Sequence, residues 1–551
     1  MLDDSGEPPS QNSKRSKSTM FGRPGQAAVI LVAALGLVFA LYHITRPRAP
    51  LPPLTVSMWY WHQPFQLSKA ETQTLNRMGV RELFVHAGTF KLKDQKLILV
   101  LPQRWASPTA LPVHLVFNFD YGVVRAFSTL QNAALDADIE RLTDQEIKRA
   151  ESGKIKIAGI QLDFDCPTSR LPKYAELLHP LHTALKKKHL ALSATGLSTW
   201  LSSRNLHAVV DNLDFLVPQF YEAETPANRN DFSPIFSPGR LERGLQAAGR
   251  LGKPVYAGLP AYGHALVYDD KDHLMGMYRD AGPDDTANDP RFKLEKSYPA
   301  DSKGRPATRS SYIGEDIVDF AAPSPNGQRQ SWHIRYDLPS PALVEKALAM
   351  VKAHRPPNCR GVILFRIAEP KERLAAPLSG IESAVSGSPL KPDIQISIRC
   401  TAAPWEMIDT PKNDSRLPQE VTVTVANRGS VPTFFDQDSV VVNLQFDRPG
   451  FSLPATAGTT HLETFLTDLP FTSDVSQLAG VGLSSSSSRA NQIRIHRVML
   501  GAGESFRIGP IRIPADGATH VRGFWSVRSV GGFDTLTGQI PSTNLGTPTA
   551  P

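Results

Sequence analysis

The stretch that decides the fold is Gly159-Ile160-Gln161-Leu162-Asp163-Phe164-Asp165-Cys166-Pro167. The apolar run that enters it, from Lys154 to Ile160, is typical of a strand inside a parallel sheet. Side chains alternate between the two faces of a strand, so Gln161, Asp163 and Asp165 are predicted to point the same way. Two acids about 6–7 Å apart on one face repel each other and can hold different protonation states. The structural alternative is a solvated strand end or a helix-capping aspartate.

Outward from this stretch, strand-like and helix-like segments alternate, which indicates a parallel α/β fold. Strands are predicted at residues 56–61, 83–86, 113–120, 159–165, 190–195, 214–222, 254–259 and 361–366. Helices are predicted from Ser68 onward and at residues 136–151, 173–188, 241–251 and 341–354. Eight such units fit a (β/α)₈ TIM barrel over residues 54–380, with a polar insertion between strands 7 and 8 at about residues 268–332. A doubly wound open sheet is the alternative, but no glycine-rich phosphate fingerprint follows any strand.

The pattern changes after Ser386-Gly387-Ser388-Pro389 to alternating or β-branched runs without helical periodicity. We therefore predict a C-terminal all-β sandwich domain over residues 391–537, followed by a flexible Pro/Thr-rich tail at residues 538–551.

The N-terminus carries a basic tail, residues 1–24, ahead of an uncharged run from Ala27 to Tyr42. We interpret residues 25–44 as a transmembrane signal anchor or a signal peptide. Val38-Phe39-Ala40 could be a cleavage site, whereas Arg46 and Arg48 beyond the run favour an uncleaved anchor. Because the basic excess lies upstream, the bulk of the chain is predicted to be exported, either periplasmic or extracellular.

Composition narrows the function classes. The net charge is +7, but the basic residues are spread out and no aromatic-plus-basic motif appears, so we expect no nucleic-acid partner. The cysteines, Cys166, Cys359 and Cys400, lack the spacing of a metal site or a disulfide framework. We predict no metal and no cofactor.

The active site of such a barrel lies at the carboxyl ends of its strands. Aromatic faces and acceptor-rich rims gather there, and these suit a sugar, whose C–H faces stack and whose hydroxyls need hydrogen bonds. The candidate catalytic residues are Asp165, Asp163, Tyr221 and Glu222. The candidate substrate-binding residues are Trp59, Trp61, His86, Asn118, Asp120, Gln161, Gln219, Tyr262 and Arg366. Core filling by Trp59, a satisfied strand-end His86 and a helix-capping Asp120 are the alternatives that stay open.

The quoted stretch resembles the fourth-strand signature of glycoside hydrolase family 18, the chitinase-like barrels, which reads Gly-Ile-Asp-Ile-Asp-Trp-Glu-Tyr-Pro. Further similarities follow in the right order over roughly residues 55–370. They are Gln219-Phe220-Tyr221-Glu222, Lys253 to Gly263, Arg335-Tyr336-Asp337 and Gly361-Val362-Ile363-Leu364-Phe365. The chain is also similar to an uncharacterised family of bacterial exported barrels.

The resemblance implies substrate-assisted cleavage of an N-acetyl sugar. Asp163 would orient the acetamido group and Tyr221 would bind its carbonyl, while Asp165 would be the general acid, its pKa raised by Asp163 and by burial. The chain departs from the family where Ala158 and Gln161 replace acids, where Asp165 is one methylene shorter than the family's glutamate, and where Phe365 replaces a tryptophan.

Three functions remain open at this point. The chain could be a glycosidase acting on an envelope or extracellular polysaccharide, a non-catalytic carbohydrate-binding barrel, or an envelope scaffold that interacts through its β-sandwich.

Overall fold

The computed structural model describes residues 51–221, 225–278, 281–322, 332–403, 418–452, 461–466, 470–471, 483–484, 490–514 and 517–545. Within them, Leu54 onward forms one compact unit. The predicted membrane or signal segment lies outside the described residues. None of the helices in the described ranges is long and apolar enough to cross a membrane.

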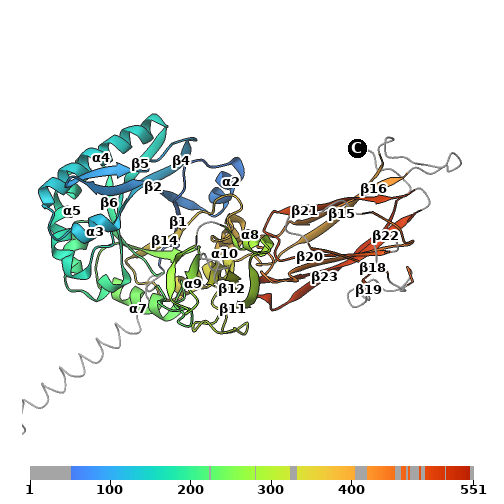
Figure 1. Ribbon diagram of the computed structural model, residues 1–551. Helices are drawn as coiled ribbons and strands as arrows, with labels where there is room; N and C mark the ends of the chain where they lie inside the picture. Colours follow the sequence, from blue (N-terminus) through green and yellow to red (C-terminus); the bar gives the residue numbers. More distant parts are fainter. Residues whose placement is uncertain are drawn as a thin grey trace, which may run out of the picture. The chain divides into compact units, whose positions relative to one another are not determined.

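Parallel strands, paired in chain order, form a closed barrel (Figure 1). They are β1 (Thr55–Tyr60), β2 (Val80–Lys93), β4 (Thr109–Phe119), β5 (Ile155–Asp163), β6 (Ala191–Gly196), β7 (Phe215–Pro218), β8 (Val255–Pro260) and β14 (Cys359–Phe365). Strand β1 pairs with both β14 and β2, so the sheet closes on itself. The predicted barrel is confirmed and the open sheet is excluded.

Residues 96–100, where the sequence analysis placed no strand, form β3 (Lys96–Val100), which makes an antiparallel hairpin with the extended end of β2.

Helices follow the strands and cover the outside of the barrel; Figure 1 shows α4 and α5 over β4, β5 and β6. Their bounds are α2 (Lys69–Arg77), α3 (Tyr121–Ala126), α4 (Asn132–Ser152), α5 (Leu171–Lys187), α6 (Leu206–Val210), α7 (Pro238–Gly249), α9 (Pro341–His354) and α10 (Leu378–Ser386). Helix α2 begins where the sequence predicts, because Ser68 and Glu71 form a reciprocal capping box.

Two hydrophobic layers hold the barrel. The larger lies between strands and helices and includes Leu162, Phe164 and Leu178. The smaller fills the barrel interior and consists of Trp59, Phe84, Val116, Phe215, Val217 and Ile363. The barrel is therefore packed with side chains, and a ligand can reach it only at its ends.

The described residues of the insertion between β8 and β14 form a five-stranded antiparallel sheet and a short helix, α8 (Pro283–Asn288). Its strands are β9 (His264–Tyr268), β10 (Leu274–Met277), β11 (Lys293–Pro299), β12 (Glu315–Ala322) and β13 (Trp332–Pro339). The sheet extends beyond residues 268–332, because β9 pairs with β13 down to His264 and Asp337. Arg335-Tyr336-Asp337, expected after the insertion, therefore lies on a strand of its sheet.

The C-terminal part is all-β, as predicted, with two antiparallel sheets around one core. One sheet contains β15 (Ile394–Ala402), β16 (Gln419–Asn427) and β21 (Ser505–Ile513). The other contains β17 (Val440–Phe446), β18 (His461–Leu466), β19 (Leu483–Ser484), β20 (Gln492–Arg497), β22 (His520–Arg528) and β23 (Thr535–Asn544). The predicted flexible tail, residues 538–551, is wrong for residues 538–544, since β23 pairs with β22 as far as Asn544. Its last residues, 546–551, lie outside the described residues.

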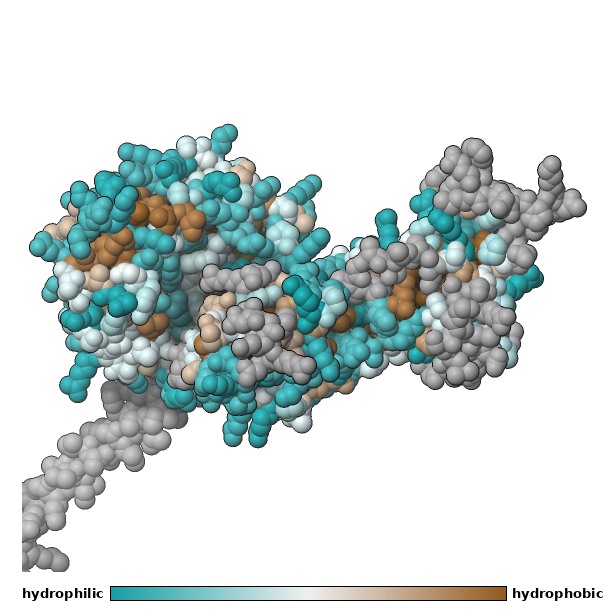
Figure 2. Space-filling model, in the orientation of Figure 1, coloured by the Kyte–Doolittle hydropathy of each residue, from teal (hydrophilic) through white to brown (hydrophobic). Residues whose placement is uncertain are grey.

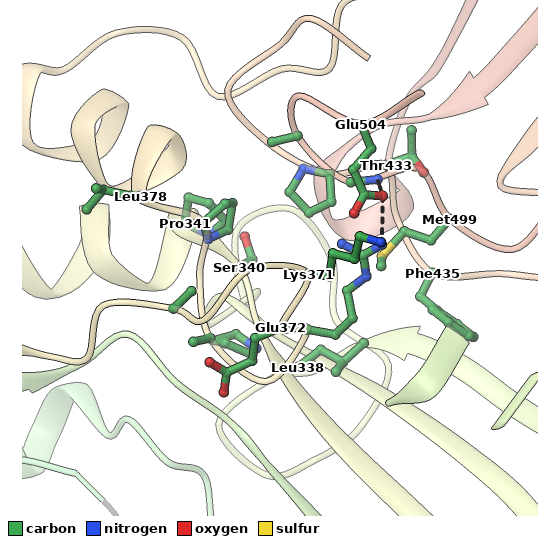
Figure 3. Close-up of a pocket in the computed structure, with 18 of the residues that line it drawn as sticks. Leu338, Ser340, Pro341, Lys371, Glu372, Leu378, Thr433, Phe435, Met499 and Glu504 are labelled. Atoms are coloured by element: carbon green, nitrogen blue, oxygen red, sulfur yellow. Dashed lines mark hydrogen bonds and ion pairs between the residues drawn. The ribbon is translucent and has the colours of Figure 1, made fainter. Parts of the chain in front are cut away.

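Side chains of the barrel loops, the insertion and the β domain enclose a cavity of about 230 Å³. Figure 3 shows Leu338 and Ser340 facing it together with Thr433 and Met499. Arg373 lies beside it and pairs with Asp284 at 2.9 Å and with Glu504 at 2.7 Å. The charge of Arg373 is thus compensated within the protein.

Candidate functional site

A cleft of about 400 Å³ opens at the carboxyl ends of the barrel strands. It is lined by Trp59, Trp61, Asp163, Asp165, Thr195, Leu197, Ser198, Thr199, Gln219, Tyr221, Thr225, Tyr262 and Phe365. These residues come from the ends of β1, β5, β6, β7, β8 and β14 or from the loops that follow. The cleft is therefore at the end of the barrel where such folds carry their active sites.

Asp163 is held by three hydrogen bonds from neighbouring side chains. Its Oδ1 accepts hydrogen bonds from Thr195 Oγ1 at 2.7 Å and from Gln219 Nε2 at 3.4 Å, and its Oδ2 accepts one from Asn118 Nδ2 at 3.0 Å. Loss of hydration on burial raises the pKa of Asp163, and these three hydrogen bonds offset part of that rise. Neighbouring strands thus fix the orientation of this carboxyl group.

Asp165 lies two residues beyond the end of β5 and lines the same cleft. Between the two acids, Phe164 is buried against Phe119, Phe127 and Tyr174, which anchors the turn. Asp165 itself is exposed, so the burial that the sequence analysis expected for it is absent. Asp165 is exposed because β5 ends at Asp163, so the alternation of the strand no longer places the next acid inside the barrel.

Aromatic side chains form the floor and walls of the cleft. Phe365 lies at their centre, with its ring centroid 5.3 Å from that of Trp61, 5.9 Å from that of Tyr221 and 5.0 Å from that of Tyr262. Trp59 is 1 % exposed and lies beneath them, 5.8 Å from Phe365. Such surfaces stack against the C–H faces of sugar rings.

Gln161 has a different place from the one predicted for it. It is fully buried inside the barrel, where its Oε1 accepts a hydrogen bond from Trp59 Nε1 at 2.7 Å and its Nε2 donates to Ser193 Oγ at 3.3 Å. Gln161 therefore holds Trp59 rather than contacting a ligand.

Three further candidates have structural roles. His86 packs behind Trp61, with ring centroids 4.7 Å apart, and burial lowers its pKa to about 4. Asp120 caps α3 by accepting a hydrogen bond from the Val123 N–H at 3.0 Å, which is the alternative left open above. Arg366 pairs with Glu372 at 2.5 Å. These three do not line the cleft.

The remaining predicted residues divide as follows. Asn118 reaches the site through its bond to Asp163, whereas Glu222 lies outside the described residues. The candidates that line the cleft are Trp59, Trp61, Asp163, Asp165, Gln219, Tyr221 and Tyr262.

The predicted site left out several cleft residues. Thr195 ends one predicted strand and Phe365 lies at the end of β14, so a strict reading of strand ends would have included both. Ser198 and Thr199 belong to the short 3₁₀ helix η2 (Ser198–Ser202), for which the sequence offered no comparable signal. In the described part of the chain, no group of His, Cys, Asp and Glu side chains is arranged to hold a metal ion.

Comparison with known proteins gives one family match and several similar structures. Residues 122–277 match a family described as a domain of unknown function (DUF3142). No curated protein matches the chain in sequence.

Among solved structures, a chitinase from Chromobacterium violaceum ATCC 12472 is 17% identical, with 61% of this chain and 98% of that chain covered and a TM-score of 0.38. The spore cortex-lytic enzyme SleL of Bacillus megaterium QM B1551 is 11% identical, with 62% and 75% covered and a TM-score of 0.37. A chitinase-like agglutinin from Robinia pseudoacacia is 14% identical, with 60% and 100% covered and a TM-score of 0.37. The resemblance to chitinase-like barrels seen in the sequence thus recurs among solved structures, and at these scores it says nothing about activity.

Proposed function

We propose that the barrel is a glycoside hydrolase acting on a polysaccharide whose sugars carry an acetamido group. One observation supports this most: Asp163, oriented by three donors, and Asp165 line a single cleft walled by aromatic rings.

The hydrogen bonds of Asp163 leave room for a substrate. A carboxylate offers about four acceptor positions. Two donors reach Oδ1 and one reaches Oδ2, so one position on Oδ2 remains for the N–H of an acetamido group. Tyr221 lines the same cleft, and a tyrosine O–H is a suitable donor to the acetamido carbonyl.

The reaction then follows the substrate-assisted course. The acetamido oxygen forms a bond to the anomeric carbon as the bond to the leaving oxygen breaks, and the proton of Asp165 passes to that oxygen. Water next adds to the anomeric carbon, reopens the cyclic intermediate and returns a proton to Asp165. A bound sugar would cover the exposed Asp165, and the loss of water would raise its pKa toward the range a proton donor needs.

A second function, sugar binding without cleavage, is favoured by the exposure of Asp165 in the free protein. A general acid must keep its proton near neutral pH, and the burial that would help it do so is absent in the free protein. The same cleft would then serve as a lectin-like site, and Asp163 would keep its orienting role.

The test uses residues 54–551, which form one compact unit. Binding and hydrolysis of N-acetylated oligosaccharides and of matched de-N-acetylated ones are measured by calorimetry and product chromatography. Cleavage of the acetylated set supports the hydrolase, and binding without cleavage supports the lectin-like site. If the protein neither binds nor cleaves either set, a carbohydrate function is ruled out. Asp163→Asn should weaken discrimination between the two sets.

We also propose that the chain acts outside the cytoplasm, anchored or exported through residues 25–44. The basic tail ahead of an uncharged run supports this proposal.

A further inference from the structure

A second groove, of about 370 Å³, adjoins the cleft. It lies between η2 and α7 and is lined by Ser198, Thr199, Leu201, Ser202, Arg240, Arg243, Gly244, Ala247 and Arg250. We call it the arginine groove.

The sequence of α7 explains the shape of this groove. Positions 240, 243, 247 and 250 fall on one face of a helix with 3.6 residues per turn. Gly244 and Ala247 contribute little or no side chain there, so the face is hollow between the arginines. Gly244 also allows close packing, since a Cβ at this position would lie 2.1 Å from the ring of Phe220. The groove is thus the space that small residues leave beneath guanidinium groups.

Two of the three arginines that line the groove, Arg243 and Arg250, are exposed, and neither forms an ion pair with a residue that the structure describes. Elsewhere the chain pairs its buried arginines, such as Arg335 with Asp319 at 2.9 Å. An oxyanion in the groove could therefore pair with the guanidinium groups of Arg243 and Arg250.

The arginine groove is continuous with the cleft. Ser198 and Thr199 line both. A smaller space beside them is bordered by Ser198, Gln219, Tyr221 and Arg240, so it joins residues of the cleft to an arginine of the groove. A saccharide chain that leaves the cleft along η2 would therefore bring its next units over the guanidinium groups.

We propose that the arginine groove binds the anionic substituents, carboxylate or sulfate, of an acidic polysaccharide whose chain occupies the cleft. Guanidinium groups bind both kinds of oxyanion through paired hydrogen bonds, and the serine and threonine hydroxyls can bind the neighbouring sugar hydroxyls. This inference rests on the carbohydrate function proposed above and narrows its substrate class to acidic glycans.

The test compares hexasaccharides of the same ring count by calorimetry at low salt: neutral chitohexaose, hyaluronan hexasaccharide with carboxylates, and chondroitin sulfate hexasaccharide with carboxylates and sulfates. Wild-type protein should bind the acidic ligands at least about tenfold more tightly, since one charge-assisted hydrogen bond is worth about that factor. Higher salt should reduce the preference. If chondroitin sulfate binds more tightly than hyaluronan, the groove binds the sulfate groups. If the two bind with equal affinity, the groove binds the carboxylates.

The variants are Arg243→Glu/Arg250→Glu and, as a milder pair, Arg243→Gln/Arg250→Gln. Both pairs should abolish the preference for acidic ligands and leave the affinity for chitohexaose unchanged. Arg81→Glu/Arg360→Glu is the control: it makes the same change of net charge at the amino ends of β2 and β14, away from the groove.

The outcomes separate the two proposals. Tight binding of chitohexaose without any preference for acidic ligands overturns the arginine groove and leaves the carbohydrate function standing. An equal loss of preference in the Arg81/Arg360 control also overturns it, because the effect would then come from net charge. If no hexasaccharide binds, both proposals fail.

Discussion

Asp163 and Asp165 are two residues apart, yet their surroundings differ. Asp163 is held by donors from three neighbouring strands or their ends, whereas Asp165 is exposed at the mouth of the cleft. In the proposed reaction Asp163 would therefore orient the substrate, and Asp165 would act as the proton donor once a substrate covers it.

If Asp165 is the proton donor, Asp165→Asn should lower kcat by about 10²–10⁴, the usual contribution of a general acid. Substrate affinity should change little, and Asp165→Glu, with its longer side chain, should keep or increase activity. Steady-state kinetics on a cleaved oligosaccharide measures this. Asp94→Asn, on the β2–β3 turn, is a control that removes a charge away from the cleft. Full activity of Asp165→Asn would rule out the assignment.

At Gln161, a single buried side chain supports the cleft floor. Gln161→Leu would remove the acceptor of Trp59 Nε1 and leave a buried N–H unpaired. The free energy of unfolding should fall by about 1–3 kcal/mol, the cost of an unsatisfied buried donor. Urea denaturation followed by tryptophan fluorescence measures the change. An unchanged urea midpoint would contradict the prediction, because Trp59 would then have found another partner. Gln219→Leu is the control: it gives the change in unfolding free energy when a partly exposed glutamine is replaced.

At the scale of elements, β12 of the insertion sheet is tied to the wall of the cleft. Glu315 accepts a hydrogen bond from the Phe236 N–H at 2.8 Å, and Phe236 forms a backbone bridge with Tyr221. The insertion thus supports the residue proposed to bind the acetamido carbonyl.

Glu315 also makes stability depend on pH. Desolvation, with a further contribution from Asp337, raises its pKa from 4.5 to about 8. Between these values the folded state binds more protons than the unfolded state, so stability falls as the pH rises from about 5 to 8.

Glu315→Gln removes this titration and keeps an oxygen that can accept from Phe236. The variant should therefore gain stability relative to wild type as the pH rises from 5 to 8, by a few kcal/mol at most, since each pKa unit corresponds to about 1.4 kcal/mol. Urea unfolding at pH 5, 6.5 and 8 tests this. Asp316 and His86, whose pKa values shift to about 7 and about 4, contribute equally to both proteins and cancel in the difference. A difference that stays constant with pH would contradict the prediction.

At the scale of the whole molecule, the β domain has a core of its own. Its buried cluster draws only on residues between Ile394 and Leu545. Phe435 and Met499, in contrast, pack with side chains of the insertion.

Figure 2 shows a surface that is mostly hydrophilic, and the large hydrophobic side chains exposed in the described part are Leu51, Leu101, Tyr121, Met275 and Met277.

We therefore predict that residues 391–551, expressed alone, unfold in one cooperative transition. The fragment should be less stable than the same domain in the full chain, because Phe435 and Met499 lose their apolar partners. Calorimetry or circular dichroism with heating tests this. An aggregated or unfolded fragment would count against the predicted boundary near Lys391.

The predicted topology of the N-terminus has its own test. An alkaline-phosphatase fusion after Pro53 should be active, because the uncharged run from Ala27 to Tyr42 would carry the enzyme across the membrane. A fusion at the same position to a reporter that works only in the cytoplasm should be inactive. The opposite pattern would contradict export.

The barrel, its strand order and the end at which the cleft opens could all be predicted from the sequence alone. Local periodicity carries this information, because buried parallel strands are continuous apolar runs with polar residues at their carboxyl ends. Ser68 and Glu71 likewise indicate where a helix begins. Asp163 could be found in this way because it is the last residue of β5.

Only the tertiary structure decided which strand-end residues share the cleft. Asn118 and Asp120 stand two residues apart, yet one bonds Asp163 and the other caps α3. The extent of the insertion sheet depends on pairing between His264 and Asp337, and the arginine groove on residues 198–202 lying beside α7. Each of these contacts joins segments distant in the chain or depends on where a strand ends. Local patterns do not encode such contacts, because packing and backbone pairing across the fold select them.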